Sequence, residues 1–282
     1  MGSNTESQSA YADTGTSSSL EPASVLESVT VEFDDYVAIS EVSLEIPLGP
    51  ATAIMGLSGS GKSTLLKVAA GLIPPGAGRV RILGHYMRGM SDRQLTALRR
   101  RVGFVFQEGA LWQNMSIYRN LEVPLEHQKP ELTHGQRKER IERALGGFRF
   151  PRSLSLRPSV LSAGEAKIIS FVRSTITDPQ LLFLDEPTTF IDRSNQNRIF
   201  DRLRTLKRAG TTLVMVTHNP TVAAQLADRV IVMYDSQVIA HDTMSKVSAL
   251  EDERVHEVLE EVLGDAVTYD EDLLSLLGAA EP

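Results

Sequence analysis

The sequence predicts an α/β fold with a mostly parallel central sheet, an antiparallel N-terminal β-subdomain and an inserted α-helical subdomain. From residue 29 on, short runs rich in β-branched residues alternate with helical stretches. The most apolar runs, such as 181–184 and 213–216, lack a polar face and suit strands buried on both sides of a sheet. Residues 108–160 instead hold helical stretches interrupted by prolines and no strand-like run.

The individual elements follow from these patterns in chain order. Strands are expected at 29–33, 42–46, 51–55, 79–83, 102–106, 181–184, 211–216 and 230–233. Helices are expected at 62–70, 117–125, 135–146, 162–176, 193–208, 220–226 and 252–263.

The chain divides into three segments. Residues 1–24 are rich in Ser, Thr, Ala and Glu, and they predict a disordered tail because they cannot bury enough apolar surface to offset the entropy of ordering. Residues 25–245 form the predicted body, with the helical subdomain inserted at about 108–177. Residues 246–282 predict a helix followed by an acidic tail.

Composition and charge exclude several classes of protein. The 282 residues carry a net charge of −7 and a pI of about 5.5, which is not the basic footprint of a nucleic-acid-binding domain. The lack of cysteine excludes a disulfide scaffold and a thiolate metal site. No apolar run approaches the roughly 20 residues of a membrane span, and the N-terminus lacks the pattern of a signal peptide. We expect a cytoplasmic protein that contacts a membrane only through a partner.

The strongest local motif is a phosphate-binding loop. Residues 56–64 read G-L-S-G-S-G-K-S-T, which fits G-x-x-x-x-G-K-[ST], between a predicted strand and a predicted helix. Glycines let backbone N–H groups converge on phosphate oxygens, and the helix N-terminus adds positive potential. Lys62 is predicted to reach the β- and γ-phosphates, and Ser63 to ligate Mg²⁺. The predicted nucleotide-binding residues of the loop are Gly56, Leu57, Ser58, Gly59, Ser60, Gly61, Lys62, Ser63 and Thr64.

Two carboxylates, Asp185 and Glu186, follow the apolar run 181–184. Ligands of open α/β sheets bind at the carboxyl ends of the strands. Asp185 is therefore predicted to hold Mg²⁺ through water, and Glu186 to polarise the attacking water as a general base. Taken alone, the pair is equally well a strand followed by an acidic turn.

Three further positions carry polar residues at predicted element ends. Gln107 follows the run 102–106, and His218 follows the run 211–216 with one residue between. The sequence L-S-A-G-E at 161–165 opens a predicted helix, and a Ser followed three residues later by Glu is also the pattern of a capping box. Each is ordinary by itself. Gln107 and His218, however, fall at the edge where the phosphate loop and Asp185 converge.

In this order and spacing, the motifs resemble those of the ATP-binding-cassette superfamily, and the resemblance covers about residues 29–240. Walker A lies at 56–64, the Q-loop at Gln107, the signature at 161–165, Walker B at 181–185, the catalytic glutamate at Glu186, the D-loop end at Asp192 and the switch histidine at His218. The resemblance implies a P-loop NTPase of the ABC type, an ATPase with ATP and Mg²⁺ as cofactors that works as a homodimer.

The resemblance also implies a mechanism. Two cassettes face head to tail, so the signature of one would act in trans on the nucleotide held by the other. Gln107 would sense Mg²⁺ and the lytic water, and His218 would contact the γ-phosphate. An aromatic residue before Walker A would stack on adenine, with Phe33 assigned and Tyr36 as the alternative. The signature residues are Ser162, Ala163, Gly164 and Glu165.

The sequence departs from the family pattern at two motifs. In the signature, Ala163 replaces glycine and Glu165 replaces glutamine of the usual L-S-G-G-Q. A carboxylate near ATP phosphates is unfavourable unless it is turned away or paired. The D-loop, T-F-I-D at 189–192, is bulkier than the usual S-A-L-D. We expect hydrolysis to survive and the coupling between subunits to be unusual.

Residues 106–117, F-Q-E-G-A-L-W-Q-N-M-S-I, are similar to the Q-loop region of ATPases that serve MCE-type lipid transporters, the Mla-like systems. The D-E-R-V sequence at 252–255 also fits these ATPases. This resemblance implies a peripheral subunit on the inner face of the cytoplasmic membrane, bound to an integral permease and an MCE-domain protein. Residues 110–117 would dock a permease helix, or would instead close the core of the helical subdomain.

Three other classes share part of the pattern. A cassette for lipoprotein release or small-solute transport would use the same catalytic residues and differ only in its partner. A soluble cassette of DNA repair would need a long coiled coil, and one acting on ribosomes would need a second cassette; neither pattern is seen in this sequence. A P-loop kinase would not have the signature and His218.

Overall fold

A computed structural model of the protein describes residues 21–217 and 220–267, without the side chains of 220–222 and 263–267. The strands are β1 (Pro22–Phe33), β2 (Tyr36–Pro47), β3 (Thr52–Gly56), β4 (Ala77–Ile82), β5 (His85–Tyr86), β6 (Val102–Val105), β7 (Leu181–Asp185), β8 (Thr212–Val216), β9 (Arg229–Tyr234) and β10 (Gln237–Asp242). The α-helices are α1 (Lys62–Ala69), α2 (Asp92–Arg99), α3 (Ile117–Gln128), α4 (His134–Gly146), α5 (Ala163–Thr175), α6 (Arg193–Arg208), α7 (Pro220–Leu226), α8 (Met244–Ser248) and α9 (Glu253–Val267). A short 3₁₀ helix covers Pro158–Val160.

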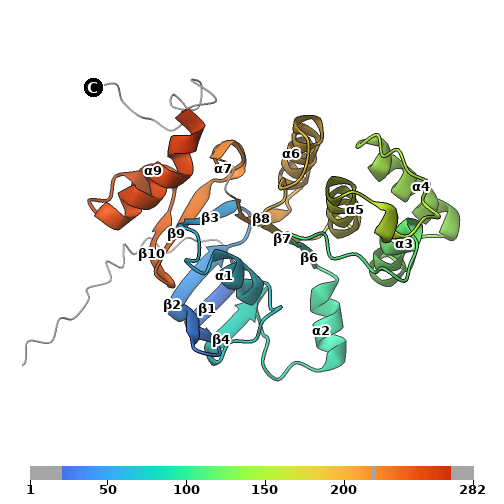
Figure 1. Ribbon diagram of the computed structural model, residues 1–282. Coiled ribbons are helices and arrows are strands. Elements are labelled where there is room, and N and C mark those ends of the chain that lie inside the picture. The colour runs from blue at the N-terminus through green and yellow to red at the C-terminus, as the bar shows by residue number, and fades with distance from the viewer. Residues whose placement is uncertain (1–20, 218–219, 268–282) are drawn as a thin grey trace, which may run out of the picture.

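The strands of the described residues form two sheets, in the orders β10-β9-β3-β8-β7-β6 and β2-β1-β4-β5. The first is parallel except at its β10 edge, and the second is antiparallel. Figure 1 shows β1, β2 and β4 beside α1, with α3 and α4 at one end of the molecule and α9 at the other. The predicted fold class is confirmed in each of its parts: the mostly parallel sheet, the antiparallel β-subdomain and the helical insertion.

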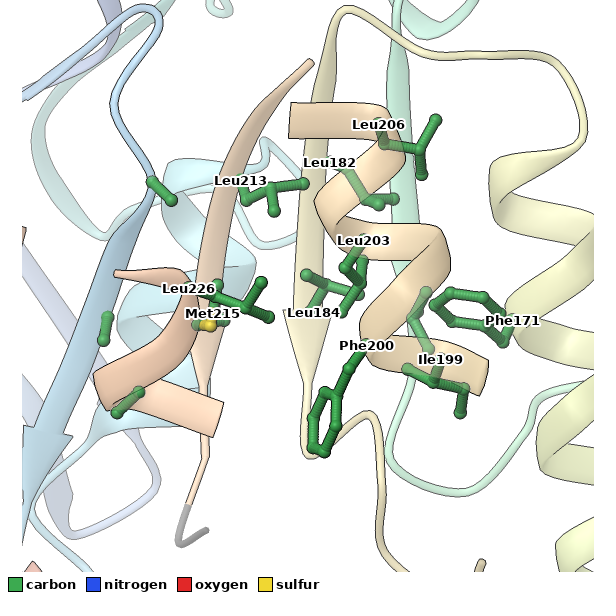
Figure 2. Packing of buried hydrophobic residues seen from close by; sticks show 14 of the residues in the cluster. Phe171, Leu182, Leu184, Ile199, Phe200, Leu203, Leu206, Leu213, Met215 and Leu226 are labelled. Atoms are coloured by element: carbon green, nitrogen blue, oxygen red, sulfur yellow. The ribbon is translucent and has the colours of Figure 1, made fainter. Parts of the chain in front are cut away.

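The parallel sheet is apolar on both faces because both faces are covered. Every residue of β3, β7 and β8 is buried. Since successive side chains of a strand point to opposite faces, Leu182 and Leu184 pack with α5 and α6, whereas Phe183 packs on the side of α1 and the antiparallel sheet. Figure 2 shows the first of these faces, where Leu203 of α6 lies against β7. Uninterrupted apolar runs in the sequence thus correspond to strands between two layers.

The first strand begins earlier than its sequence indicates. β1 starts at Pro22, and Ala23 and Ser24 are fully buried. The Ser24 hydroxyl donates a hydrogen bond to the Ala69 carbonyl oxygen at 2.9 Å, at the end of α1. The prediction of a disordered tail is therefore wrong for residues 22–24, because a long-range partner satisfies the serine that composition assigns to a tail. Residues 1–20 of the predicted tail lie outside the described residues.

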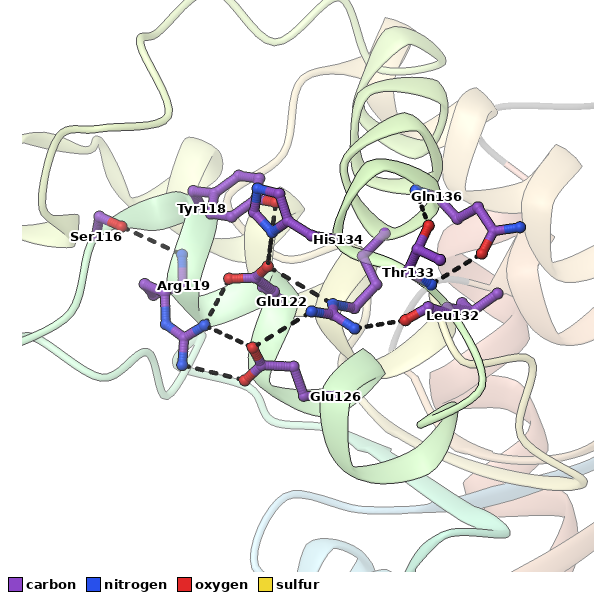
Figure 3. A network of polar contacts seen from close by, with 10 residues as sticks. Ser116, Tyr118, Arg119, Glu122, Glu126, Leu132, Thr133, His134 and Gln136 are labelled. Atoms are coloured by element: carbon purple, nitrogen blue, oxygen red, sulfur yellow. Dashed lines mark hydrogen bonds and ion pairs between the residues drawn. The ribbon is translucent and has the colours of Figure 1, made fainter.

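The segment between β6 and β7 is helical and carries a buried polar network. Helix α3 continues through Pro124, where the sequence suggests an interruption, because Leu121 and Leu125 anchor it in the core. The Glu122 carboxylate, 4% exposed, joins α3 to α4 through His134 at 2.9 Å and Arg137 at 3.6 Å. Figure 3 shows this network, in which Arg119 also pairs with Glu122.

Helix α9 packs on the body through Val255, Val258, Leu259 and Val262, which are buried beside β3 and β9. The core therefore extends past residue 245, where the sequence places the end of the body. The acidic stretch after Val267 lies outside the described residues. Among the helices of the described residues, none is both long enough and apolar enough to cross a membrane.

Candidate functional site

The sheet order brings the predicted site residues to one edge. β3, β8, β7 and β6 are neighbours, and they run in the same direction. Asp185 pairs with Val216, and Leu184 pairs with Val105, so these strands end at one level. The loop at 56–64, the carboxylates after β7 and Gln107 after β6 consequently share the carboxyl edge of the sheet. His218, which follows β8 by two residues, lies outside the described residues.

The loop 57–61 between β3 and α1 has the geometry of a phosphate cradle. Gly61 has a φ of +94°, and a Cβ there would lie 2.2 Å from the Ala38 carbonyl oxygen, so only glycine fits. Gly59, with a φ of +80°, has open space where a Cβ would be. The Lys62 ammonium donates hydrogen bonds to the carbonyl oxygens of Gly56 and Leu57, at 2.7 and 2.6 Å. These contacts hold Lys62 over the loop, where a phosphate chain can take over its donors.

A hydroxyl and a carboxylate at this edge fit a magnesium ion. The Ser63 hydroxyl donates a hydrogen bond to Asp185 Oδ1 at 2.8 Å. Asp185 is 1% exposed, and its Oδ2 accepts no hydrogen bond within the described residues, with Lys67 Nζ at 3.7 Å as its ion-pair partner. Hard oxygen ligands suit Mg²⁺, which binds proteins through one or two such groups together with substrate phosphates. Nowhere in the described residues do three or more His, Cys, Asp or Glu side chains gather to hold a metal by themselves, so phosphate oxygens would have to complete the shell.

Burial sets the electrostatics of Lys62. Desolvation lowers the pKa of the Lys62 ammonium, and the carboxylates of Glu186, Glu261 and Asp185 oppose this effect. Glu261 belongs to α9, so the C-terminal helix adds negative potential at the loop. A lysine in this environment is a strong partner for a phosphate, because the bound anion replaces the water that burial removed.

Glu186 is held in a strained position beside Asp185. It is 7% exposed, and its φ of +47° is unusual for a residue with a side chain. Its backbone N–H donates to the Val216 carbonyl oxygen at 3.0 Å, which continues the β7–β8 pairing for one residue. The Glu186 carboxylate accepts from the Thr189 hydroxyl at 3.4 Å, and its place after the carboxyl end of β7 suits a base that orients water at the edge of the sheet.

Lys167 lies next to the predicted nucleotide site, although none of the sequence motifs includes it. It lies on α5, is 1% exposed, and donates to the carbonyl oxygens of Phe106, Gln107 and Asp185 at 2.7, 2.9 and 3.3 Å. Burial lowers the pKa of its ammonium to about 8, although the charges of Asp185 and Glu186 oppose the shift. A single side chain thereby joins the helix that follows Ser162 to the ends of β6 and β7. The only hint in the sequence is a lysine inside an apolar stretch, A-K-I-I at 166–169.

The residues at 162–165 form a helix start with a paired carboxylate. The Ser162 hydroxyl accepts from the Glu165 N–H at 3.2 Å, and Glu165 Oε2 accepts from the Ser162 N–H at 2.8 Å, a capping box. Glu165 Oε1 accepts from Arg152 Nε at 2.8 Å. The Arg152 guanidinium and the Ser162 N–H together hold the pKa of Glu165 below its usual range. The carboxylate is thus both turned back on the helix and paired, while Ala163 is exposed.

The D-loop and the signature touch within one chain. A Cβ on Gly164 would lie 2.7 Å from the Phe190 carbonyl oxygen, so glycine is required there. Phe190 itself is 68% exposed and has a φ of +66°. Asp192 caps α6 by accepting from the Asn195 N–H at 3.0 Å. Within the described part of the chain, no hydrogen bond or ion pair links 162–165 to the phosphate loop, and this separation is compatible with action on a second copy.

The two remaining predicted residues are exposed. The Gln107 side chain lies at the surface, and its carbonyl oxygen is the part that Lys167 fixes. Phe33 is 46% exposed at the β1–β2 turn, opposite Tyr36, so it is not a core residue. The Tyr36 hydroxyl donates to the Gly59 carbonyl oxygen at 2.8 Å. Among the two aromatic candidates for adenine, it is therefore Tyr36 that contacts the phosphate loop.

The family to which these features belong emerges from comparison with known proteins. The ABC transporter family model matches residues 39–189. The macrolide export ATP-binding/permease protein MacB of Chlorobaculum tepidum is 37% identical over 224 residues, which are 78% of this chain and 33% of that protein. The uncharacterised ABC transporter ATP-binding protein YknY of Bacillus subtilis is 31% identical over 218 residues, which are 77% of this chain and 94% of that protein. The chain thus spans about a third of the length of its MacB relative.

Solved structures of a related cassette share the fold. A dimeric structure of the ATP-binding cassette MJ0796 in a post-hydrolysis state, bound to ADP and Pi, has a TM-score of 0.71 and 30% identity to this chain. It covers 78% of this chain and 98% of its own. The ADP and Pi bound in that structure match the chemistry expected of the site described here.

Proposed function

Since this chain belongs to the ABC transporter family, and its cassette is an ATPase that uses ATP with Mg²⁺, we propose that it is the subunit that powers transport by a separate membrane permease. The observation that carries the proposal is the pairing of Ser63 with Asp185 at 2.8 Å, directly between the phosphate loop and Glu186. We assign Mg²⁺ to Ser63 and Asp185, the phosphates to the loop and Lys62, and the base role to Glu186. Chemistry of this kind consists of positioning and charge stabilisation, which these residues supply.

An ATPase assay on purified variants tests these assignments. Glu186→Gln should bind ATP normally and lose activity by at least about a hundredfold, the usual contribution of a general base. Lys62→Ala should lose ATP binding, because the buried ammonium is the cation of the cradle. Asp201→Asn, a change at an exposed carboxylate of α6, is the matched control. Near-normal turnover in Glu186→Gln would remove that residue from the base role.

We further propose that the cargo is lipid and that the permease belongs to an MCE-type system. The support is the loop 106–117, whose sequence is similar to that of MCE-associated ATPases. Trp112 is 42% exposed, while Ile117 is fully buried, so this loop both closes the subdomain core and offers an aromatic side chain at the surface. Asn120, fully buried, accepts from the Trp112 N–H at 2.9 Å and so fixes the loop backbone. A preformed aromatic anchor of this kind suits a partner helix.

A second candidate is favoured by the sequence identity of the relatives. MacB of Chlorobium luteolum is 40% identical over 211 residues, and MacB is a macrolide export ATP-binding/permease protein. In this alternative, the chain drives an exporter whose permease resembles the permease part of MacB. The catalytic residues would be the same, and only the partner and the cargo would differ.

A pulldown from native membranes in mild detergent distinguishes the two. Mass spectrometry of proteins and lipids should recover a permease, an MCE-domain protein and bound phospholipid. Recovery of a MacB-like permease without an MCE-domain protein would keep the ATPase role and discard the lipid role. Recovery in soluble complexes alone would contradict a role in transport and would also remove the proposed place of the protein at the inner face of the cytoplasmic membrane.

A further inference from the structure

Charge is distributed very unevenly along this chain. Residues 79–101 hold seven arginines and one aspartate, a net charge of +6. Because the whole chain carries −7, the remaining residues carry −13. The segment, which includes β5 and α2, is therefore a locally basic region on an acidic protein, and it creates a positive potential that the total charge conceals.

Four of these arginines are exposed and lack a carboxylate partner. Within the described residues, no ion pair involves Arg88, Arg93, Arg99 or Arg100, which we call the arginine surface. Arginines elsewhere in the structure are commonly neutralised: ion pairs to Asp or Glu form at Arg119, Arg140, Arg143, Arg152, Arg202, Arg204 and Arg254. Among the described residues, Arg149, Arg157, Arg193 and Arg208 are also exposed without an ion pair, but they are scattered along the chain, whereas the arginine surface gathers four such arginines between positions 88 and 100.

Helix α2 carries Arg93 and Arg99 of the arginine surface, Arg100 is its C-cap residue, and Arg88 lies in the loop before it. A capping box between Ser91 and Gln94 fixes its start, and Leu98, 4% exposed, anchors it in the core. At 100° per residue, Arg93 and Arg100 point away from Leu98. Figure 1 shows α2 outside both sheets, before β6. The helix therefore presents these two guanidinium groups to solvent, beside a single carboxylate of its own, Asp92.

We propose that the arginine surface binds the phosphate groups of anionic phospholipids at a bilayer surface. Guanidinium groups bind phosphate oxygens in bidentate fashion, and all basic side chains of 79–101 except His85 are arginine. Tyr86 is 44% exposed, and Met87 and Met90 beside it are half-buried, so apolar surface lies next to the cations, as at the headgroup level of membranes. Seven helical residues span about 10 Å, roughly one Debye length, so the charges act together.

This surface would orient the cassette on the membrane independently of the permease. It goes beyond the proposed function and rests on it only in assuming a membrane nearby. The test measures vesicle binding without a permease, and ATP enters only the separate check of folding, so a negative result would leave the ATPase proposal intact. An acidic segment of a partner protein could offer similar charge, and the experiment separates it from lipid.

The experiment is flotation of the full chain with vesicles of phosphatidylcholine, with or without roughly a third phosphatidylglycerol. One variant changes the arginine surface, as Arg88→Gln, Arg93→Gln, Arg99→Gln and Arg100→Gln together. A control variant removes the same number of charges elsewhere, as Lys138→Gln, Arg143→Gln, Arg204→Gln and Arg208→Gln together. Both variants carry −11, since −7 − 4 = −11. ATPase activity, for which no role is assigned to these residues, reports that each variant is folded.

The proposal expects the wild-type chain to bind the anionic vesicles at least about a hundredfold more tightly than the neutral ones, and to be released at about 0.5 M salt. The control variant should bind like the wild type, and the arginine-surface variant should lose the preference. Equal binding to both vesicle types, or equal loss in both variants, would overturn the proposal. So would vesicle binding by the arginine-surface variant equal to that of the wild type, which would leave an acidic protein segment as the partner of this surface.

Discussion

At the scale of single residues, Glu165 shows how a change within a motif is accommodated. Its carboxylate replaces the neutral amide of the family and would add negative charge near bound phosphates. The sequence predicts that such a group must be turned away or paired, and in the structure it is both, through Ser162 and Arg152. The sequence could not identify Arg152 as the partner, because thirteen residues and a 3₁₀ helix separate it from Glu165.

Removing Arg152 should therefore matter only while Glu165 is charged. We predict that Arg152→Ala raises the apparent KM for ATP on the order of threefold at low salt, the size typical of an exposed ion pair. The effect should vanish in the Glu165→Gln background and at high salt. ATPase titrations of the four proteins of this double-mutant cycle measure it. The same loss in both backgrounds would show that Arg152 acts in some other way.

At the scale of elements, Lys167 fastens α5 to the ends of β6 and β7. The three carbonyl oxygens that it contacts belong to the Q-loop and to Walker B. The signature, the Q-loop and the catalytic strand are thereby linked through one ammonium group. The sequence motifs predict each of the three segments but not this link. The tertiary contacts of a buried lysine produce no periodicity and no residue spacing that could be recognised in a sequence.

We predict that Lys167→Met lowers kcat by about 10- to 100-fold and leaves the KM for ATP nearly unchanged, because small displacements of positioned groups are costly to rate. Lys207→Met is the matched control. Lys207 likewise donates to a carbonyl oxygen, that of Leu226, at 2.8 Å, and also to Asp228 at 2.7 Å, from the last turn of α6, and it contacts none of the motifs by a hydrogen bond among the described residues. Steady-state measurements of kcat and of the KM for ATP in both variants test this prediction. Equal losses of kcat would mean that Lys167 serves stability alone.

The lowered pKa of Lys167 also predicts a dependence of stability on pH. Its folded-state pKa is about 8, below the ordinary 10.5. Between these values the unfolded state binds more protons, so stability should rise with pH in this window. From pH 7.5 to 9.5 the gain attributable to this group is about 2 kcal/mol. Urea unfolding of wild type and Lys167→Met at both pH values measures it, and an identical change in the two proteins would contradict the assignment.

The polar network around Glu122 likewise connects two elements, since it joins α3 to α4. Burial raises the pKa of the carboxyl group, but hydrogen bonds from Arg119 and His134 outweigh this, so the pKa lies below its usual range. A carboxylate of this kind stabilises the fold above its unfolded-state pKa and loses that effect as pH falls through the folded-state value. The helical subdomain should therefore weaken in acid.

We predict that Glu122→Gln destabilises the protein by about 1–3 kcal/mol at pH 7, since it removes the buried charge that joins α3 to His134 and Arg137 of α4, although Glu126 still pairs with Arg119 and Arg137. The difference from wild type should shrink as the pH falls below the ordinary glutamate pKa, because the wild-type carboxylate becomes protonated as the pH passes through its lower folded-state pKa. Glu142→Gln, in an exposed pair with Lys138 on α4, is the control and should be close to neutral. Urea unfolding at pH 7 and in acid measures the effect, and a difference unchanged in acid would contradict it.

At the scale of the whole molecule, the sequence predicts the central sheet and its covering helices better than the peripheral elements that bury few residues. Alternating apolar and helical stretches sufficed for the parallel sheet, since strands between two layers are apolar throughout. Helix α2 and strand β10 were not predicted, because α2 buries only Leu98 and β10 has a largely exposed or half-buried pattern. Elements that bury little leave little apolar signal in the sequence.

The candidate site was predicted as a set of segments and not as an assembled geometry. The phosphate loop, Asp185 and Glu186 lie together, as the motifs indicated. Within the part of the chain that the structure describes, the helix that begins at 162–165 is linked to this site by Lys167, and Gly164 lies against the D-loop. We therefore predict that the signature of a second copy completes the site, and the related cassette MJ0796 has been solved as a dimer.

The most direct test of the account is whether ATP alone brings two chains together. Sedimentation velocity of Glu186→Gln should be measured with Mg-ATP and with Mg-ADP, and again after adding Ser162→Glu, which places a charge in the signature. We predict a dimer with ATP, a monomer with ADP, and a monomer under both conditions for the double variant. A mass that is the same with ATP and ADP, or a dimer that tolerates Ser162→Glu, would contradict a nucleotide site completed by the signature of a second copy.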